Sequence, residues 1–221
     1  MNDTTTPLPA TSSGTPTSTP TTTATSTPGS VPATPARGAA AGRILEATSA
    51  CIVQKGAADV SLQDVAEAAG VSKALIHYHF HDKGELLARL VEWLRAGLVA
   101  RQETALTGVS PSSALDALWQ WLSDELERGD LRALLDLSLV QGTAVQAAVR
   151  STATARREAS ALVITKLFQA LGLRPRVPAP LIADAFVAFV DGLALDRVVA
   201  PERNARLSFD VFWLATLGLT D

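Results

Sequence analysis

Residues 61–81, SLQDVAEAAGVSKALIHYHFH, constrain the fold more than any other part of the chain. They read as two short helices joined by a tight turn at Gly70, a residue type that can adopt the left-handed backbone that ends a helix. Apolar residues occupy the positions where two crossed helices share a small core, namely Val65, Ala66, Ala69, Val71 and Ile76. The pattern predicts a helix-turn-helix unit.

The second helix of this unit carries small and polar residues between its apolar positions. Ser72, Lys73, Ala74, His77 and Tyr78 are predicted to face away from the shared core. Residues of these types suit contacts with phosphates and with base edges in the major groove of DNA. The pattern therefore favours sequence-specific binding of double-stranded DNA.

The composition of the chain limits the classes of protein to which it can belong. The 221 residues are 47% hydrophobic, which is enough for one or two domains with a core, and the net charge is −3. A nearly neutral chain does not suit non-specific DNA binding, but a specific binder can rely on a few placed contacts. The single cysteine, Cys51, rules out an internal disulfide framework and most cysteine-based zinc sites, and we expect it in the core. These features favour a cytoplasmic protein.

The sequence predicts no membrane span and no signal peptide. The most apolar stretch, residues 181–190, is interrupted by Asp184 and is far shorter than the roughly 20 residues that a span requires. The N-terminus lacks the basic-then-apolar pattern of a signal peptide.

Residues 1–38 are rich in Thr, Ser, Pro and Ala and include seven prolines, so we expect a disordered tail.

From Gly42 onward the chain reads as helix, and no segment alternates with period two for long enough to predict a strand. Helices are predicted to begin at about Gly42 and after the caps Ser61, Ser72 and Asp82, the last with Glu85 as its reciprocal partner. A further helix is expected to open with a Ser113–Asp116 pair. We predict an all-α fold, with an N-terminal three-helix helix-turn-helix domain at residues 39–88 and a helical bundle at residues 89–221.

The last two predicted helices, about 180–199 and 202–219, are apolar nearly all round. A helix with two apolar faces needs burial on two sides, and a second copy of the chain is the simplest cover for one of them. We therefore expect a homodimer. The candidate interface residues are Phe186, Phe189, Val190, Leu193, Phe209, Phe212 and Trp213.

Catalysis and metal binding are not favoured. All three histidines lie at positions 77, 79 and 81, and the first and last are spaced to share a helical face. Because Asp82 reads as the cap of the next helix, the preceding helix should end near Phe80 and displace His81. There is no glycine-rich phosphate loop, and Asp184 and Asp191 lie about 10 Å apart on one helix as a polar stripe. We expect no enzyme activity, no metal and no cofactor.

The chain resembles the TetR family of bacterial transcriptional regulators. The resemblance is carried by RILEAT at 43–48, the break at Gly56, and SLQDVAEAAGVSKALIHYHFHDKGELL at 61–87. It implies a dimer in which each N-terminal domain places its third helix in the major groove of an operator. It also implies that the C-terminal bundle binds an effector and dimerises through its last two helices.

The resemblance also assigns roles to single residues. Ser61, Ser72, Tyr78 and Lys83 match phosphate-contacting positions, whereas Lys73, Ala74 and His77 match positions that face the groove. Ile76 and Phe80 match packing positions. Leu75 stands where threonine is common and offers an apolar surface to a thymine methyl group, and His77 stands where tyrosine is usual.

The implied function is that of a transcriptional regulator, a repressor that binds an operator with the sequence of an inverted repeat. A small and mostly apolar effector is expected to release the repressor from the operator. Candidate pocket residues are Trp119, Asp136, Gln141 and Phe168. The alternative is a non-catalytic helical scaffold or interaction protein that uses the same fold without binding an operator.

Overall fold

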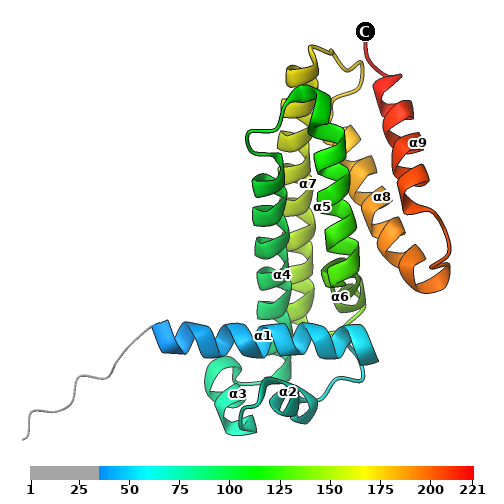
Figure 1. Ribbon diagram of the computed structural model, residues 1–221. Helices are drawn as coiled ribbons and strands as arrows, with labels where there is room; N and C mark the ends of the chain where they lie inside the picture. Colours follow the sequence, from blue (N-terminus) through cyan, green and yellow to red (C-terminus); the bar gives the residue numbers. More distant parts are fainter. Residues whose placement is uncertain (1–34) are drawn as a thin grey trace, which may run out of the picture. The chain divides into compact units, whose positions relative to one another are not determined.

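The computed structural model describes residues 35–221, which form helices joined by short turns (Figure 1). Nothing in this part of the chain forms a β-strand beyond one isolated bridge between Pro175 and Thr220. The elements are α1 Pro35–Lys55, α2 Leu62–Ala69, α3 Lys73–Phe80, α4 Lys83–Leu106, the 3-10 helix η1 Pro111–Ser113, α5 Ala114–Arg128, α6 Asp130–Ser138, α7 Thr143–Leu171, α8 Ala179–Val199 and α9 Ala205–Leu217. The predicted all-α fold is confirmed.

Local hydrogen bonds explain where the first helices begin. The Ser61 hydroxyl accepts from the Asp64 N–H at 3.1 Å, and the Asp64 carboxylate accepts from the Ser61 N–H at 2.9 Å, which completes a capping box on α2. The Ser72 hydroxyl accepts from the Leu75 N–H at 3.2 Å and begins α3. Gly70 ends α2 with a φ of 63°, a conformation that disfavours any residue with a Cβ.

The first of two cores holds α1 to α4 together. Its fully buried members include Ile44, Ile52, Val65, Ile76 and Leu90. Residues from later in the chain complete it, because α6 and the start of α7 pack against the same cluster through Ala133, Leu134, Leu137, Val145 and Ala148. The helix-turn-helix region is therefore anchored to the bundle by side chains as well as by the chain itself.

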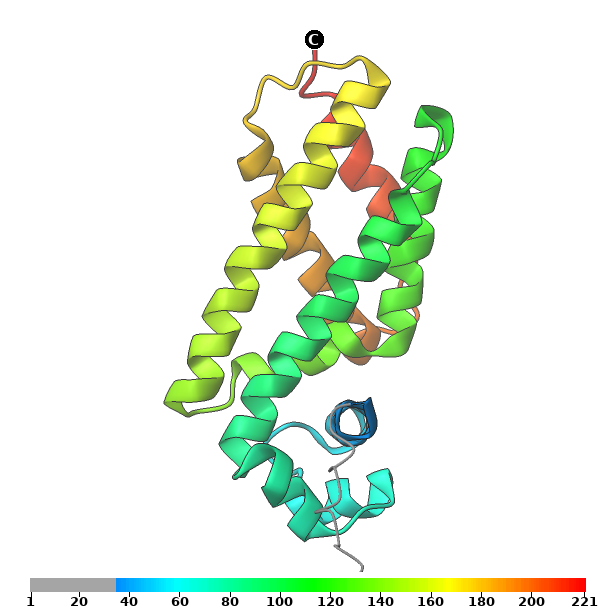
Figure 2. The same cartoon turned by 90° about the vertical axis from the view of Figure 1, so that its left-hand side faces the viewer.

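Helix α4 runs without interruption from the first core into the second (Figures 1 and 2). Leu86 to Leu94 contribute to the first core, and Leu98 belongs to the second. The second core lies among α4, α5, α7, α8 and α9, with Leu122, Phe168, Phe186, Phe209 and Trp213 among its most buried side chains. Any change in the bundle that shifts α4 thus acts on a helix that also supports α3.

Ion pairs join the helices of the bundle. Arg101 of α4 binds Glu125 of α5, whose side chain is 1% exposed, and Asp130 at the start of α6. On the other side, Arg156 of α7 binds Asp191 of α8 at 2.7 Å. The predicted polar stripe of α8 is therefore paired, because Asp184 and Asp196 also meet arginines, Arg157 and Arg203.

Several helix boundaries differ from those predicted. Helix α1 begins at Pro35 and not at Gly42, so the predicted end of the tail at residue 38 falls inside a helix, while residues 1–34 lie outside the described part. Helix α9 begins at Ala205 because the Asn204 carboxamide oxygen accepts from the Leu207 N–H at 3.2 Å. Ser113 makes no capping hydrogen bond to α5, since a 3-10 turn beginning at Pro111 precedes it.

The reciprocal partner proposed for Asp82 is also wrong in part. Asp82 does cap α4, because its carboxylate accepts from the Glu85 N–H at 2.8 Å. The Glu85 side chain, however, lies 3.0 Å from the His81 ring and pairs with it instead of with the cap backbone. The predicted domain boundary at 88/89 falls inside α4, which is one reason why the two regions share a helix.

The predicted dimer residues are mostly internal to the protomer. Phe186, Val190, Leu193, Phe209 and Trp213 are 1–5% exposed in the single chain. Phe189 and Phe212 are half-buried and stack on each other with ring centroids 4.7 Å apart. The aromatic residues hold α9 against α8, because aromatic side chains provide the largest buried area per residue. Aliphatic residues instead form the exposed apolar side of these helices: Leu181, Leu195, Val198, Val199, Leu207, Val211 and Leu214.

Candidate nucleic-acid interface

Helix α3 is divided into a buried side and an exposed side. Ile76 and Phe80 are 1% and 4% exposed and fix the helix on the first core, as predicted for packing positions. Ser72, Lys73, Ala74, His77 and Tyr78 are exposed, and Leu75 is half-buried beside them. We call these six residues the α3 surface. Their exposure confirms the predicted orientation of the helix, whereas their contacts with DNA stay a prediction.

The proposed phosphate-contacting residues lie where helices begin. Ser72 precedes α3 and Lys83 is the first residue of α4, so both adjoin backbone N–H groups that have no partner within their helix. Ser61 precedes α2, but its hydroxyl also lies 2.6 Å from the Asp64 carboxylate, which engages it within the protein. The helix ends thus offer N–H donors of the kind that bind phosphate oxygens.

His77 is oriented by the backbone that follows its own helix. Its Nδ1 lies 2.7 Å from the His81 carbonyl oxygen, and a carbonyl oxygen only accepts, so Nδ1 carries a proton. In the neutral ring this leaves Nε2 as an acceptor on the exposed side of α3. The carbonyl is available because His81 takes a φ of 52° just after the helix ends. Sequence reasoning placed His77 on the groove side but did not predict this contact.

Lys83 also has a structural contact. Its ammonium donates to the Ala58 carbonyl oxygen at 3.2 Å, which ties the start of α4 to the loop between α1 and α2. Lys83 forms no ion pair in the described part of the chain, so its charge remains available to a phosphate. No sequence signal identifies this carbonyl partner, since backbone acceptors exist at every residue.

An ion pair fixes α2 against the end of α1. The Lys55 ammonium binds the Asp64 carboxylate, which also accepts from Ser61. Donation by Lys55, and then by Ser61, lowers the pKa of Asp64 far below its ordinary value. The same pair raises the pKa of Lys55. Nearby, burial raises the pKa of the Cys51 thiol, in agreement with the predicted core position.

The histidines do not form a metal site in the described chain, where no group of three metal-ligating side chains comes together. His79 is half-buried between Tyr78 and Phe80, with ring centroids 5.3 and 6.0 Å away. His81 is exposed and pairs with Glu85. The same part of the chain holds no helix with the length and apolar character to cross a membrane.

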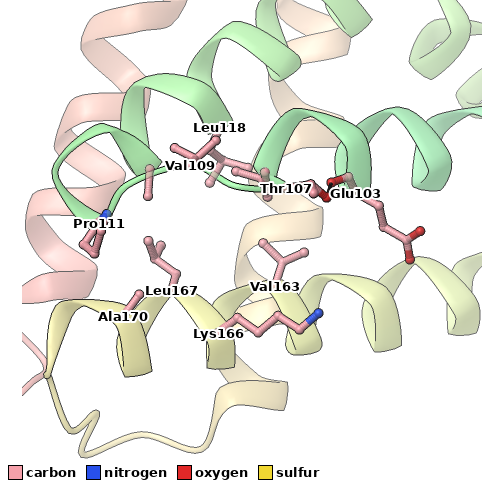
Figure 3. A pocket seen from close by; sticks show the side chains of 11 residues that line it. Glu103, Thr107, Val109, Pro111, Leu118, Val163, Lys166, Leu167 and Ala170 are labelled. Carbon is pink, nitrogen blue, oxygen red and sulfur yellow. Dashed lines mark hydrogen bonds between the residues drawn. The ribbon is translucent and has the colours of Figure 1, made fainter.

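The bundle contains a cavity of about 510 Å³ at its end remote from α3. Figure 3 shows Val163 and Leu167 of α7 on one side and Val109 and Leu118 on the other. Glu103, Thr107 and Lys166 are its polar residues, and all three are exposed. We call this space the end cavity.

The four predicted pocket residues do not line the end cavity, and the structure does not bring them together. Phe168 is 2% exposed within the second core, and Trp119 packs on Phe209 with centroids 5.2 Å apart. Asp136 lies on α6 near Gly56, and Gln141 is exposed in the turn before α7. Helical periodicity identifies residues that face inward but not which inward-facing residues leave space between them.

Comparison with known proteins bears on the region that contains α2 and α3. Residues 44–90 match the family described as bacterial regulatory proteins, tetR family. Residues 44–90 of this chain are thus similar to the N-terminal domain of that family of bacterial regulatory proteins.

Two curated relatives match part of this chain. The HTH-type transcriptional regulator CymR of Pseudomonas putida is 34% identical over 86 residues, which is 39% of this chain and 41% of the relative. The probable HTH-type transcriptional regulator YttP of Bacillus subtilis is 33% identical over 84 residues, or 38% and 41% of the two chains. The matched part thus spans less than half the length of these relatives.

Solved structures resemble a larger part of the chain. A putative TetR-family transcriptional regulator from Rhodococcus sp. has a TM-score of 0.67 at 24% identity and covers 82% of this chain and 98% of its own. The SmeT–triclosan complex has a TM-score of 0.61 at 20% identity, with coverage of 80% and 91%. At these identities the likeness shows that the bundle shares the fold of TetR-family proteins.

Proposed function

We propose that this chain is a sequence-specific DNA-binding transcriptional regulator that reads its operator with the α3 surface. The observation that carries the proposal is the division of α3, in which Ile76 and Phe80 are buried while Lys73, His77 and Tyr78 are exposed. A helix held in this way can enter the major groove without losing its packing. The match of residues 44–90 to the tetR family and the names of the curated relatives support the same function.

The working unit in this proposal is a homodimer. The exposed aliphatic residues of α8 and α9 support it, because Leu207, Val211 and Leu214 are spaced i, i+4 and i+7 on one side of α9 and are more than 60% exposed. Two symmetry-related α3 helices would read two half-sites about 34–36 Å apart, or a multiple of that distance. The operator is therefore an inverted repeat.

Control by a small effector is the second part of the proposal. SmeT, which shares the fold, is in complex with triclosan, and the bundle of this chain contains the end cavity. An effector that binds one arrangement of α4 more tightly than another lowers operator affinity by at most its differential affinity for the two. We propose that the chain represses transcription from its operator in the cytoplasm and that such an effector relieves the repression.

Selection from a pool of random duplex DNA by the purified protein tests the proposal. We expect enrichment of an inverted repeat and a symmetric footprint, both lost when His77 and Lys73 are replaced by alanine. A matched double variant on the bundle, Lys166→Ala with Glu103→Ala, should leave both unchanged. If no sequence is enriched, the chain is a helical scaffold and not an operator-binding regulator.

A further inference from the structure

Helices α2 and α3 end in different ways. Gly70 ends α2 with a φ of 63° and a ψ of 37°, whereas His81 ends α3 with a φ of 52° and a ψ of −57°. The Asp82 N–H donates to the Phe80 carbonyl oxygen and closes a γ-turn around His81. His81 is the one residue other than glycine with a positive φ in the part of the chain that the structure describes. A γ-turn of this kind is strained for a residue with a Cβ, and such strain is concentrated at functional sites.

The turn joins His77 and His81 through two hydrogen bonds. The His81 N–H donates to the His77 carbonyl oxygen at 2.9 Å, and the His77 Nδ1–H donates to the His81 carbonyl oxygen at 2.7 Å. Rotation about ψ sets the direction of a residue's carbonyl oxygen, so the negative ψ of His81 directs this oxygen toward the His77 ring. A left-handed end like that of α2, at Gly70, would direct it elsewhere. The second hydrogen bond therefore depends on the γ-turn.

Groups on both sides hold His81 in this conformation. Phe80 is 4% exposed in the first core, and the Asp82 carboxylate accepts from the Glu85 N–H at 2.8 Å, which fixes the start of α4. The Glu85 carboxylate also lies 3.0 Å from Nδ1 of the His81 ring. Because the side chains of Glu85 and His81 are both exposed, their pair adds little, and the fixed neighbours supply most of the restraint. The conformation of His81 therefore depends on its backbone more than on its ring.

The γ-turn determines which nitrogen of His77 can accept a hydrogen bond. A neutral histidine ring can carry its proton on either nitrogen, and the hydrogen bond that one nitrogen makes decides between them. With the proton held on Nδ1, Nε2 accepts from an amino group, which adenine and cytosine present in the major groove. With the proton on Nε2, the same ring would donate to an acceptor such as O6 of guanine or O4 of thymine. His81 thus acts on base preference through His77 rather than by a contact of its own.

We propose that His81 is a positioning residue for DNA recognition, and that its γ-turn makes His77 select an adenine or cytosine at one position of each operator half-site. The inference rests on the function proposed above. The role belongs to the conformation of the turn and not to the imidazole of His81, which is 78% exposed and lies beside Glu85. Two consequences are measurable: the position of the His77 proton in the free protein, and the base preference of the protein on DNA.

Nitrogen chemical shifts of the histidine rings, measured in ¹⁵N–¹H spectra of the full chain at alkaline pH, report which nitrogen carries the proton. The His77 signals are identified by their loss in His77→Ala, and His79 is the internal reference on the same helix. His81→Gly and His81→Val both remove the imidazole, but glycine permits the γ-turn and valine opposes it. We expect wild type and His81→Gly to hold the His77 proton on Nδ1, and His81→Val to lose this preference while the His79 signals stay in place.

Selection from random duplex DNA measures the second consequence. We expect wild type and His81→Gly to enrich adenine or cytosine at the position that His77→Ala leaves unspecified. His81→Val should lose this preference and bind the wild-type operator about tenfold less tightly, with unchanged affinity for random DNA as the control for folding. Glu85→Ala, which removes only the contact with the His81 ring, should behave as wild type does.

The inference is overturned if wild-type His77 carries its proton on Nε2, if His81→Val keeps the proton on Nδ1 or keeps the wild-type base preference, or if His81→Gly loses both as His81→Val does. The measurements on wild type and His81→Gly do not depend on the folding of His81→Val. The spectra need no DNA, so they test the turn separately from operator binding. Failure to enrich any sequence would refute the proposed function, whereas an enriched operator with the His77 proton on Nε2 would refute only this inference.

Discussion

Gly129, in the turn between α5 and α6, lies against Val53 of α1: a Cβ on Gly129 would stand 3.1 Å from the nearer Val53 methyl carbon. The φ of Gly129 is +80°, so the residue is required both by its backbone and by its neighbour. This contact is one of the points at which the bundle meets the DNA-binding region. It joins the turn that carries Asp130, the partner of Arg101, to the helix that underlies α2.

We expect Gly129→Ala to destabilise the fold and to weaken operator binding, because the added methyl group strains the turn and displaces Val53. Gly108→Ala is the matched control, since Gly108 has a φ of +72° and open space around the position of a Cβ. Left-handed backbone strain should lower the free energy of unfolding of both variants by about 1–2 kcal/mol. In urea unfolding, Gly129→Ala should lose more than this, and only Gly129→Ala should bind the operator less tightly. Equal behaviour of the two variants would show that the Val53 contact is unimportant.

The Asp64 carboxylate predicts a pH dependence. Its folded-state pKa is lowered by Lys55 and Ser61, so its contribution to stability is complete above the unfolded-state pKa of about 4 and is lost as pH falls from there toward the lower folded-state pKa. We expect Asp64→Asn to reduce the free energy of unfolding at pH 7 and the difference from wild type to shrink below pH 4. Asp59→Asn, at an exposed position in the same region, should show no such trend.

Whether these features could be predicted from the sequence depends on how far apart in the chain the interacting residues lie. The caps at Ser61 and Ser72 and the turn at Gly70 were predictable, because each depends on residues within a few positions of one another. The contacts of Gly129 with Val53 and of Lys83 with the Ala58 carbonyl join residues far apart in the chain, and no local pattern reports them.

The residues predicted for the dimer interface show the same limit of prediction from sequence. Periodicity identified α8 and α9 as apolar on more than one side, but it could not decide which side packs within the protomer. The structure assigns the aromatic side to the core and leaves Val211 and Leu214 exposed at 65% and 71%. Large aromatic residues were the obvious interface candidates from the sequence, yet they pack best where burial is complete.

We expect Val211→Asp and Leu214→Asp to convert the proposed dimer to a monomer, because each places a charge on an apolar surface that a second copy would cover. Sedimentation at micromolar concentration measures the change. Leu139→Asp is the control, since Leu139 is 77% exposed just after α6 and lies outside α8 and α9. If the charged α9 variants sediment as wild type does, the second copy binds elsewhere or the chain is monomeric.

Lys83 combines a charge with a structural hydrogen bond, and substitutions can separate the two. Lys83→Ala should weaken binding to operator and to random DNA alike, and reduce the slope of log affinity against log salt by about one per half-site. Lys83→Arg keeps the charge and should retain most of that slope. If Lys83→Ala weakens DNA binding without changing the salt slope, the effect comes from the lost hydrogen bond to the Ala58 carbonyl oxygen.

His77 should instead affect discrimination between sequences. Its Nδ1 proton is held by the His81 carbonyl oxygen, so the neutral ring presents Nε2 to the groove as an acceptor for an amino group of adenine or cytosine. We expect His77→Ala to lose about 1–3 kcal/mol of operator binding and little binding to random DNA. Titrating both proteins with operator and random duplexes measures these losses. Equal losses of His77→Ala on both duplexes would contradict a role in base recognition.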